Sequence, residues 1–169
     1  MATTGNTNLY QINTGILPKD ACIVIVKTEW NAGIIDELEH GCRRIFEQYG
    51  FTNIETVVVP GAVEIPFTIK ARWYAVSLPR PAAFIALGCV IRGDTPHFDY
   101  VCSTVTDGVL QLNMELPVPT IFGVLTVNTN EQAQERIGGK HGHKGEEAAI
   151  TAIKMIQLNQ AFQNQPPKQ

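Results

Sequence analysis

The 169-residue sequence contains no long apolar run: nothing in it approaches the roughly 18 consecutive apolar residues that a membrane helix needs. It also has no excess of basic residues, because 13 Lys and Arg against 16 Asp and Glu give a formal net charge of −3. No basic stripe interleaved with aromatic side chains is present, which argues against nucleic acid as the main partner. We therefore expect neither a membrane nor a nucleic acid partner.

Only four cysteines occur, and none has C-x-x-C or metal-finger spacing. We therefore predict no metal site and interpret Cys22, Cys42, Cys89 and Cys102 as reduced, packed thiols. The first eight residues lack the basic start and apolar stretch of a secretory signal, and they are not rich in arginine as a transit peptide would be. Together these features predict a cytoplasmic protein.

Apolar strand patterns and amphipathic helix patterns alternate along the chain between two polar tails. The length favours a single domain over 21–158, with a flexible N-terminal tail at 1–20 and a C-terminal tail at 159–169. Strands are predicted at 21–27, 55–59, 82–91 and 120–127, and helices at 31–50, 62–76, 98–114, 130–137 and 146–158. This alternation predicts an α/β fold, a three-layer α/β/α sandwich around a central, mainly parallel four-stranded sheet of flavodoxin-like type.

The end of the third predicted strand carries the most informative stretch. Its apolar run stops at Arg92-Gly93-Asp94-Thr95-Pro96, and His97 follows before the next helix. Ligands bind beyond the carboxyl ends of strands in open α/β sheets, and a helix N-terminus suits phosphate. Histidine exchanges protons near neutral pH. A phosphate site beside a proton-transfer group is therefore predicted, although Gly93 could be a turn former only and the Asp94 charge would have to point away.

Two other strand ends carry unusual residues. Trp30 follows the first strand and could stack on a planar heterocycle, or pack beneath the sheet instead. Glu64 follows the Pro60-Gly61 turn after the second strand. It could accept hydrogen bonds from a polyol or amine, or serve only as a carboxylate favoured in the first turn of a helix.

A glycine-rich stretch over 138–145 precedes the last predicted helix and is expected to be a solvated flexible loop or part of a site. Its two histidines at i,i+2 do not make a zinc signature. Asn31 is predicted to cap the first helix. Arg136, on the predicted helix over 130–137, could clamp a phosphate bidentately or be an ordinary surface residue.

The order and spacing of these segments over 21–156 resemble the 6,7-dimethyl-8-ribityllumazine synthase family. The matching segments are Glu29-Trp30-Asn31, Val59 to Pro66, Ala86 to Val101, Pro119 to Thr126, Glu131 to Arg136, and His143-Lys144-Gly145. Each segment is weakly specific alone, and together they are highly specific.

The resemblance implies a transferase of riboflavin biosynthesis that uses no cofactor. It would join 5-amino-6-(D-ribitylamino)uracil to 3,4-dihydroxy-2-butanone 4-phosphate, with His97 as the general acid/base. The residues expected to bind the ribitylaminouracil are Trp30, Asn31, Ala62, Val63, Glu64, Cys89, Val90, Ile91, Phe122 and Lys144. Those expected to bind the butanone phosphate are Asp94, Thr95 and Arg136.

The resemblance also implies a homo-oligomer. In this family the pocket lies between subunits of a pentamer, with Phe122 and Arg136 supplied by the adjacent chain, and some members assemble into a 60-subunit icosahedral shell. Association with riboflavin synthase is a further expectation. The alternatives are an archaeal-type riboflavin synthase, a non-catalytic flavin-binding paralogue, and a flavodoxin-like binding module.

Overall fold

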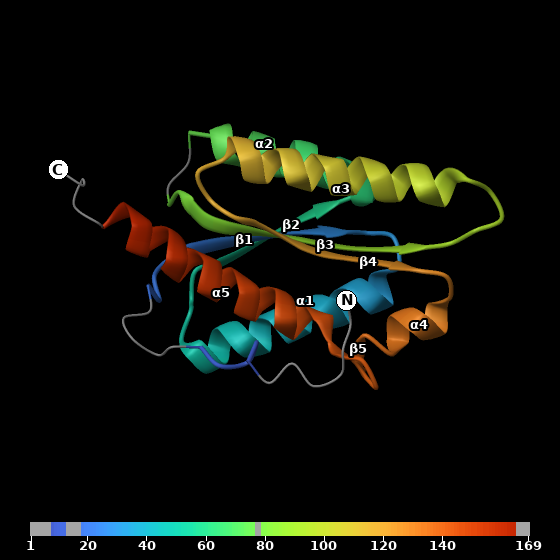
Figure 1. The fold of residues 1–169 in the computed structure, drawn as a ribbon, viewed down its shortest axis with the longest axis horizontal. Coiled ribbons are helices and arrows are strands. Elements are labelled where there is room, and N and C mark those ends of the chain that lie inside the picture. The colour runs from blue at the N-terminus through green and yellow to red at the C-terminus, as the bar shows by residue number, and fades with distance from the viewer. Residues whose placement is uncertain (1–7, 13–17, 77–78, 165–169) are drawn as a thin grey trace.

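A four-stranded parallel sheet forms the centre of the protein. The computed structural model describes residues 8–12, 18–76 and 79–164, shown in Figure 1. The strands are β1 (Cys22–Thr28), β2 (Ile54–Val59), β3 (Pro81–Ile91) and β4 (Thr120–Val127), in the order β2-β1-β3-β4. All three neighbouring pairs are parallel, which confirms the predicted α/β class and the flavodoxin-like layered sheet.

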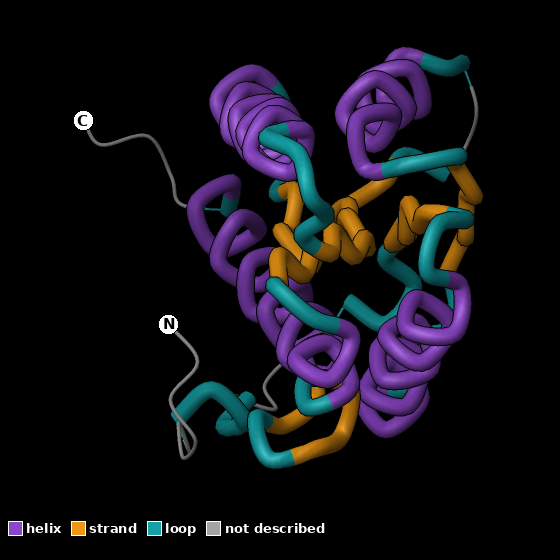
Figure 2. The backbone as a smooth tube through the Cα atoms, turned by 90° about the vertical axis from the view of Figure 1, so that its right-hand side faces the viewer, coloured by secondary structure: helices purple, strands orange, loops and turns teal. Residues whose placement is uncertain are grey.

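Helices cover both faces of the sheet, as Figures 1 and 2 show. One face carries α1 (Ala32–Tyr49) and α5 (Lys144–Gln163), and the other carries α2 (Ile65–Tyr74) and α3 (His97–Glu115). The smaller elements are a 3-10 turn η1 (Ala62–Glu64), the short helix α4 (Asn130–Gln134), and a hairpin of β5 (Ile137–Gly139) and β6 (Gly142–His143). None of the helices in the described part of the chain is long and apolar enough to cross a membrane.

Alternate side chains of β1 enter two separate hydrophobic cores. Ile23 and Ile25 belong to the core beneath α1 and α5, whereas Val24 and Val26 belong to the core beneath α2 and α3. All four side chains are fully buried. A strand covered on both faces buries side chains on each, which explains the apolar run from Ala21 to Val26.

The helices α1 and α5 pack closely because two glycines lie between them. A Cβ atom at Gly145 would overlap the backbone carbonyl of Leu38, and one at Gly41 would overlap the ring of His143. The Cys42 thiol also donates to the Gly145 carbonyl at 3.1 Å. The four cysteines are all free thiols, three of them buried and Cys102 half-buried.

The segment after β4 differs from the prediction. The helix predicted over 130–137 ends earlier, at Gln134, because Ile137 pairs with His143 in the β5–β6 hairpin. The stretch 138–145, for which a flexible loop was one expectation, is therefore largely ordered secondary structure. His143 is only 6% exposed, and its ring Nδ1 accepts a hydrogen bond from the Glu146 amide as the N-cap of α5.

The two predicted tails are described only in part, since 1–7, 13–17 and 165–169 lie outside the described residues. Of the described residues near the N-terminus, Leu9 and Ile12 pack against the core beneath α1 and α5. At the other end, α5 continues beyond the predicted end at Leu158.

A buried carboxylate on α1 is held by three donors from the edge of the sheet and its own helix. Glu39 is 8% exposed and accepts hydrogen bonds from Thr56 Oγ1 and Arg43 Nε, each at 2.8 Å, while Lys27 Nζ lies 2.7 Å from its other oxygen. Burial alone would raise the pKa of Glu39, but the hydrogen bonds from Lys27, Thr56 and Arg43 outweigh it and lower the pKa from 4.5 to about 2.

Glu39→Gln should therefore lower the free energy of unfolding, by about 2 to 3 kcal/mol at pH 7 after allowing for solvent screening. Because the folded-state pKa is depressed, the contribution of the Glu39 charge is present above the unfolded value of 4.5 and is lost as the pH falls toward 2. Urea unfolding at pH 7 and pH 3 measures this, with Glu115→Gln, in an exposed pair with Lys70, as control. Equal losses at both pH values would contradict the assignment.

Candidate functional site

A cleft of about 580 Å³ opens beyond the carboxyl ends of the first three strands. In the order β2-β1-β3-β4, the chain leaves β1 toward β2 on one side and β3 lies on the other, which is the switch point where open α/β sheets bind ligands. The predicted site residues that line this cleft are Trp30, Asn31, Ala62, Val63, Glu64, Cys89, Val90, Ile91 and His97. The structure therefore brings the residues of three strand ends into one cavity.

The Trp30-Asn31 pair begins the cleft at the end of β1. The Trp30 side chain is 73% exposed, so it does not pack beneath the sheet. Asn31 is the N-cap residue of α1, as predicted, and adopts a left-handed conformation with φ 61°, but its side chain makes no cap hydrogen bond. Its Nδ2 instead donates to the Cys89 carbonyl at 2.8 Å. The amide thus ties the end of β1 to the end of β3 across the cleft.

The turn after β2 places a carboxylate beside the indole of Trp30. A Cβ atom at Gly61 would lie 3.0 Å from Glu64 Oε2 and 3.7 Å from the Trp30 ring, so both side chains lie close to this glycine. Glu64 is exposed, and among the described residues no cation pairs with its carboxylate. It also makes no cap bond to α2. Its oxygens are therefore available to N–H or O–H groups of a ligand.

The N-terminus of α3 forms the far wall of the cleft. His97 is its first residue and is exposed, and its amide donates to Thr95 Oγ1 at 3.4 Å. Asp94 and Thr95 lie in the exposed turn just before the helix and do not themselves line the cleft. The start of a 19-residue helix favours anions, and an anion held here would lie beside its first residue, His97.

Cys89 is the one thiol that lines the cleft. Burial raises its pKa to about 11, which favours the protonated thiol at neutral pH. Among the described residues no three His, Cys, Asp or Glu side chains gather in a way that could hold a metal ion. What Cys89 offers a ligand is its backbone.

The other predicted residues lie on a second surface of the chain. Phe122 and Lys144 line a separate groove of about 400 Å³ along the edge strand β4 and the start of α5. Phe122 pairs with Ala86, three positions before Cys89 in β3, so it lies about 10 Å behind the cleft along the strand. Its side chain is 42% exposed. One chain therefore does not bring Phe122 or Lys144 to its own cleft.

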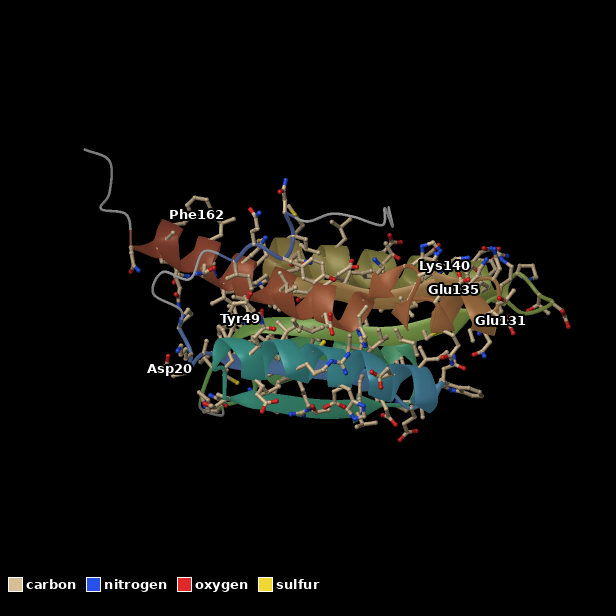
Figure 3. All side chains as sticks on the ribbon, turned by 90° about the horizontal axis from the view of Figure 1, so that it is seen from below. Asp20, Tyr49, Glu131, Glu135, Lys140 and Phe162 are labelled. Carbon is tan, nitrogen blue, oxygen red and sulfur yellow. The ribbon has the colours of Figure 1, made fainter. Side chains whose placement is uncertain are left out.

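Arg136 also lies away from the cleft, in the turn between α4 and the hairpin rather than on the predicted helix. Its Nη1 donates to the Gln132 carbonyl at 2.7 Å. The neighbouring Glu135 is already paired with Lys140 at 2.7 Å, and Figure 3 shows these two side chains together at the end of the molecule opposite Phe162. In the part of the chain that the structure describes, no carboxylate forms an ion pair with the Arg136 guanidinium.

Three lining residues were not anticipated from the sequence: Thr28, Gly61 and Val101. Val101 lies one helical turn after His97, and that i,i+4 spacing on the predicted helix is a signal that could have identified it. Thr28 is 3% exposed and its hydroxyl donates to the Trp30 carbonyl at 3.2 Å, which no sequence pattern indicates.

The fold and the cleft together define a class of protein: a flavodoxin-like α/β protein with a cleft at the strand ends of its sheet. A sequence model of the 6,7-dimethyl-8-ribityllumazine synthase family matches residues 20–160. The chain therefore belongs to this family, whose members are transferases of riboflavin biosynthesis. This confirms the resemblance found in the sequence.

Individual relatives agree over most of their length. The 6,7-dimethyl-8-ribityllumazine synthase of Parabacteroides distasonis is 44% identical over 91% of this chain and 96% of its own length. That of Porphyromonas gingivalis is 49% identical over 83% of this chain and 86% of its own length, and that of Phocaeicola vulgatus is 41% identical over 94% of each. The similarity therefore extends across the whole domain.

Proposed function

We propose that this protein condenses 5-amino-6-(D-ribitylamino)uracil with 3,4-dihydroxy-2-butanone 4-phosphate to 6,7-dimethyl-8-ribityllumazine, with release of phosphate and water. The observation that carries the proposal is the content of one cleft. An exposed indole, an unpaired carboxylate and a histidine at a helix N-terminus lie around one cavity of about 580 Å³. They suit a planar ring, a hydroxylated chain and a phosphate, respectively.

The ribitylaminouracil would occupy the part of the cleft nearest β1 and β2. Trp30 offers a freely exposed face on which the pyrimidine stacks. Glu64, with the backbone of Ala62 and Val63, accepts and donates hydrogen bonds along the ribityl chain. The backbone of Cys89, Val90 and Ile91 meets the edge of the pyrimidine, and the Asn31 amide keeps the Cys89 peptide in place.

The butanone phosphate would lie at the start of α3. The backbone N–H groups around Asp94, Thr95 and the first helical turn receive its phosphate, while the exposed Asp94 carboxylate turns to solvent. A guanidinium with no carboxylate partner is the other group that this dianion requires, and Arg136 meets that description.

His97 would move the protons of the reaction. The substrate amine attacks the ketone to give an imine, phosphate leaves as an enol forms, and the ring then closes with loss of water. Each step transfers a proton, and His97 is the one imidazole that lines the cleft in the described part of the chain. Orientation of the two substrates supplies much of the remaining acceleration.

The complete site would require a second copy of the chain. Phe122 and Lys144 line a groove separate from the cleft, along the edge strand β4 and the start of α5, and the Lys144 amide donates to the Arg136 carbonyl at 2.8 Å. A head-to-tail arrangement brings that surface of one subunit against the cleft of the next, and such contacts close into rings. Exposed apolar side chains on α2 and α3, including Phe67 and Met114, support burial in such an assembly. We propose a pentameric, cytoplasmic enzyme, with the 60-subunit shell as its larger form.

The test is to mix the purified protein with the two substrates and follow formation of the lumazine by its absorbance and fluorescence. Turnover well above the uncatalysed rate is the expected result. Tight binding of the ribitylaminouracil without turnover would instead indicate a binding paralogue. A folded oligomer that neither binds nor turns over the substrates would overturn the proposal.

A further inference from the structure

The Arg92 guanidinium contacts the first turn of α3 at two residues, Phe98 and Asp99. Its Nη2 donates to Asp99 Oδ1 at 2.8 Å and its Nη1 donates to Asp99 Oδ2 at 3.4 Å. The guanidinium carbon also lies 4.1 Å from the centre of the Phe98 ring. Phe98 and Asp99 directly follow His97, so the side chain of Arg92 holds the turn that carries the histidine.

The same residue contacts the segment that leads to Arg136. Arg92 Nε donates to Asn128 Oδ1 at 3.3 Å, and its backbone amide donates to the Val127 carbonyl at 2.9 Å. The Asn128 backbone N–H donates to Gln132 Oε1 at 2.8 Å, and Arg136 Nη1 donates to the backbone carbonyl of Gln132 at 2.7 Å. Hydrogen bonds therefore link Arg92 to the guanidinium of Arg136.

We propose that Arg92 is a positioning residue for both His97 and Arg136. It fixes the first turn of α3 through Asp99 and Phe98, and the loop that carries Arg136 through Asn128 and Gln132. This inference rests on the proposed function. Because His97 would serve the cleft of its own chain and Arg136 that of the neighbouring chain, one Arg92 side chain sets the geometry of two adjacent active sites.

The geometry distinguishes this role from direct phosphate binding and from stability. Both Nη groups of Arg92 donate to Asp99, Nε donates to Asn128, and one face of the guanidinium lies on Phe98. No pair of adjacent N–H groups is therefore left to bind a phosphate bidentately. The side chains of Arg92 and Asp99 are 43% and 60% exposed, and exposed ion pairs add little to folding. Loss of Arg92 should therefore leave the protein folded and change its kinetics.

The experiment compares kcat with the KM for the butanone phosphate in four variants. Asp99→Asn should lower kcat about 3- to 10-fold with little change in KM, and Asn128→Ala should raise KM about 3- to 10-fold with little change in kcat. Arg92→Ala should do both. Arg92→Lys keeps a charge for Asp99 but lacks the fork that also reaches Asn128, so it should restore most of kcat and not KM.

Arg80→Ala is the matched control, because Arg80 also stacks on an aromatic ring, 5.3 Å from the centre of Trp73, just before the opposite end of β3. It should leave both constants unchanged. Kinetics of Arg92→Ala that match those of Arg80→Ala would overturn the inference. The inference would also be overturned if Asp99→Asn and Asn128→Ala changed kcat and KM equally. The contacts of Arg92 with Asp99 and with Asn128 would then not have separate effects.

Binding of inorganic phosphate, measured by calorimetry, separates this inference from the proposed reaction. Arg92→Ala and Asn128→Ala should weaken phosphate binding about 3- to 10-fold, whereas Asp99→Asn should not. If the wild-type protein binds phosphate with this pattern and forms no lumazine, the reaction and the role toward His97 are wrong, and the positioning of Arg136 stands. A wild-type protein that forms lumazine while its Arg92→Ala variant is unaffected leaves the reaction standing and removes the role. Absence of both turnover and phosphate binding in the wild type would overturn both.

Discussion

His97→Ala should lower kcat by about 100- to 10,000-fold and still leave a measurable enzyme, since that is the usual range for a positioned general acid/base. His97 is the first residue of α3 and lines the cleft beside the turn where the phosphate would bind. The variant keeps the stacking surface of Trp30 and the carboxylate of Glu64, so both substrates should still be held together. Substrate orientation alone accounts for the residual rate.

Single-turnover and steady-state lumazine formation by His97→Ala measures this effect, and added imidazole should restore part of the rate. His40→Ala is the control, because His40 is an exposed histidine on α1 whose ring contacts Glu37 at 3.4 Å and lies outside the cleft. A complete loss of turnover in a folded variant would show that His97 does more than transfer protons. A rate equal to that of the wild type would remove it from the mechanism.

Mixed subunits should recover activity that neither parent variant has. His97→Ala keeps an intact Phe122–Arg136 surface, and Arg136→Ala keeps an intact cleft. If each site combines the cleft of one chain with the Arg136 surface of the next, random 1:1 mixing makes about one site in four fully wild-type at a head-to-tail interface. At a butanone phosphate concentration far below the KM of Arg136→Ala, recovery of about a quarter of the wild-type rate is therefore the expected result.

The two variants are unfolded together, refolded as a mixture, and assayed against each variant refolded alone. A further control mixes His97→Ala with a His97→Ala,Arg136→Ala double variant, which cannot make an intact site by exchange. Activity equal to the sum of the separate parents, in mixtures that light scattering shows to be co-assembled, would mean that each site uses the His97 and Arg136 of one chain. That result would contradict the shared site.

The elements of the sheet follow directly from local patterns. The structure confirms two of these local signals. One is the nearly continuous apolar run at 21–27, and the other is Gly50, with φ 76°, at the end of α1. The ordered hairpin after α4 was not predictable in this way. It depends on His143 lying against Gly41, about a hundred positions away in the chain, and no window of the sequence contains that contact.

The position of the cleft was also predictable from local patterns, but one of the contacts that shape it was not. Residues at the ends of parallel strands meet at one edge, so Trp30, Glu64 and His97 converge without any knowledge of side-chain contacts. The contact made by the Asn31 side chain was not predictable, because the side chain of an asparagine before a helix usually caps that helix. Here the left-handed backbone turns its amide to the Cys89 carbonyl instead.

The division of the interior into two cores has a consequence for how the protein is made. The core beneath α2 and α3 is built entirely from residues up to Val124, whereas the core beneath α1 and α5 needs the run from Ala148 to Ile156. During synthesis the first of these can pack while the second still lacks α5, which packs on α1, β3 and β4. A chain released before α5 is made therefore has one packed core and one exposed apolar sheet face. Such a chain is a natural substrate for chaperones and proteases.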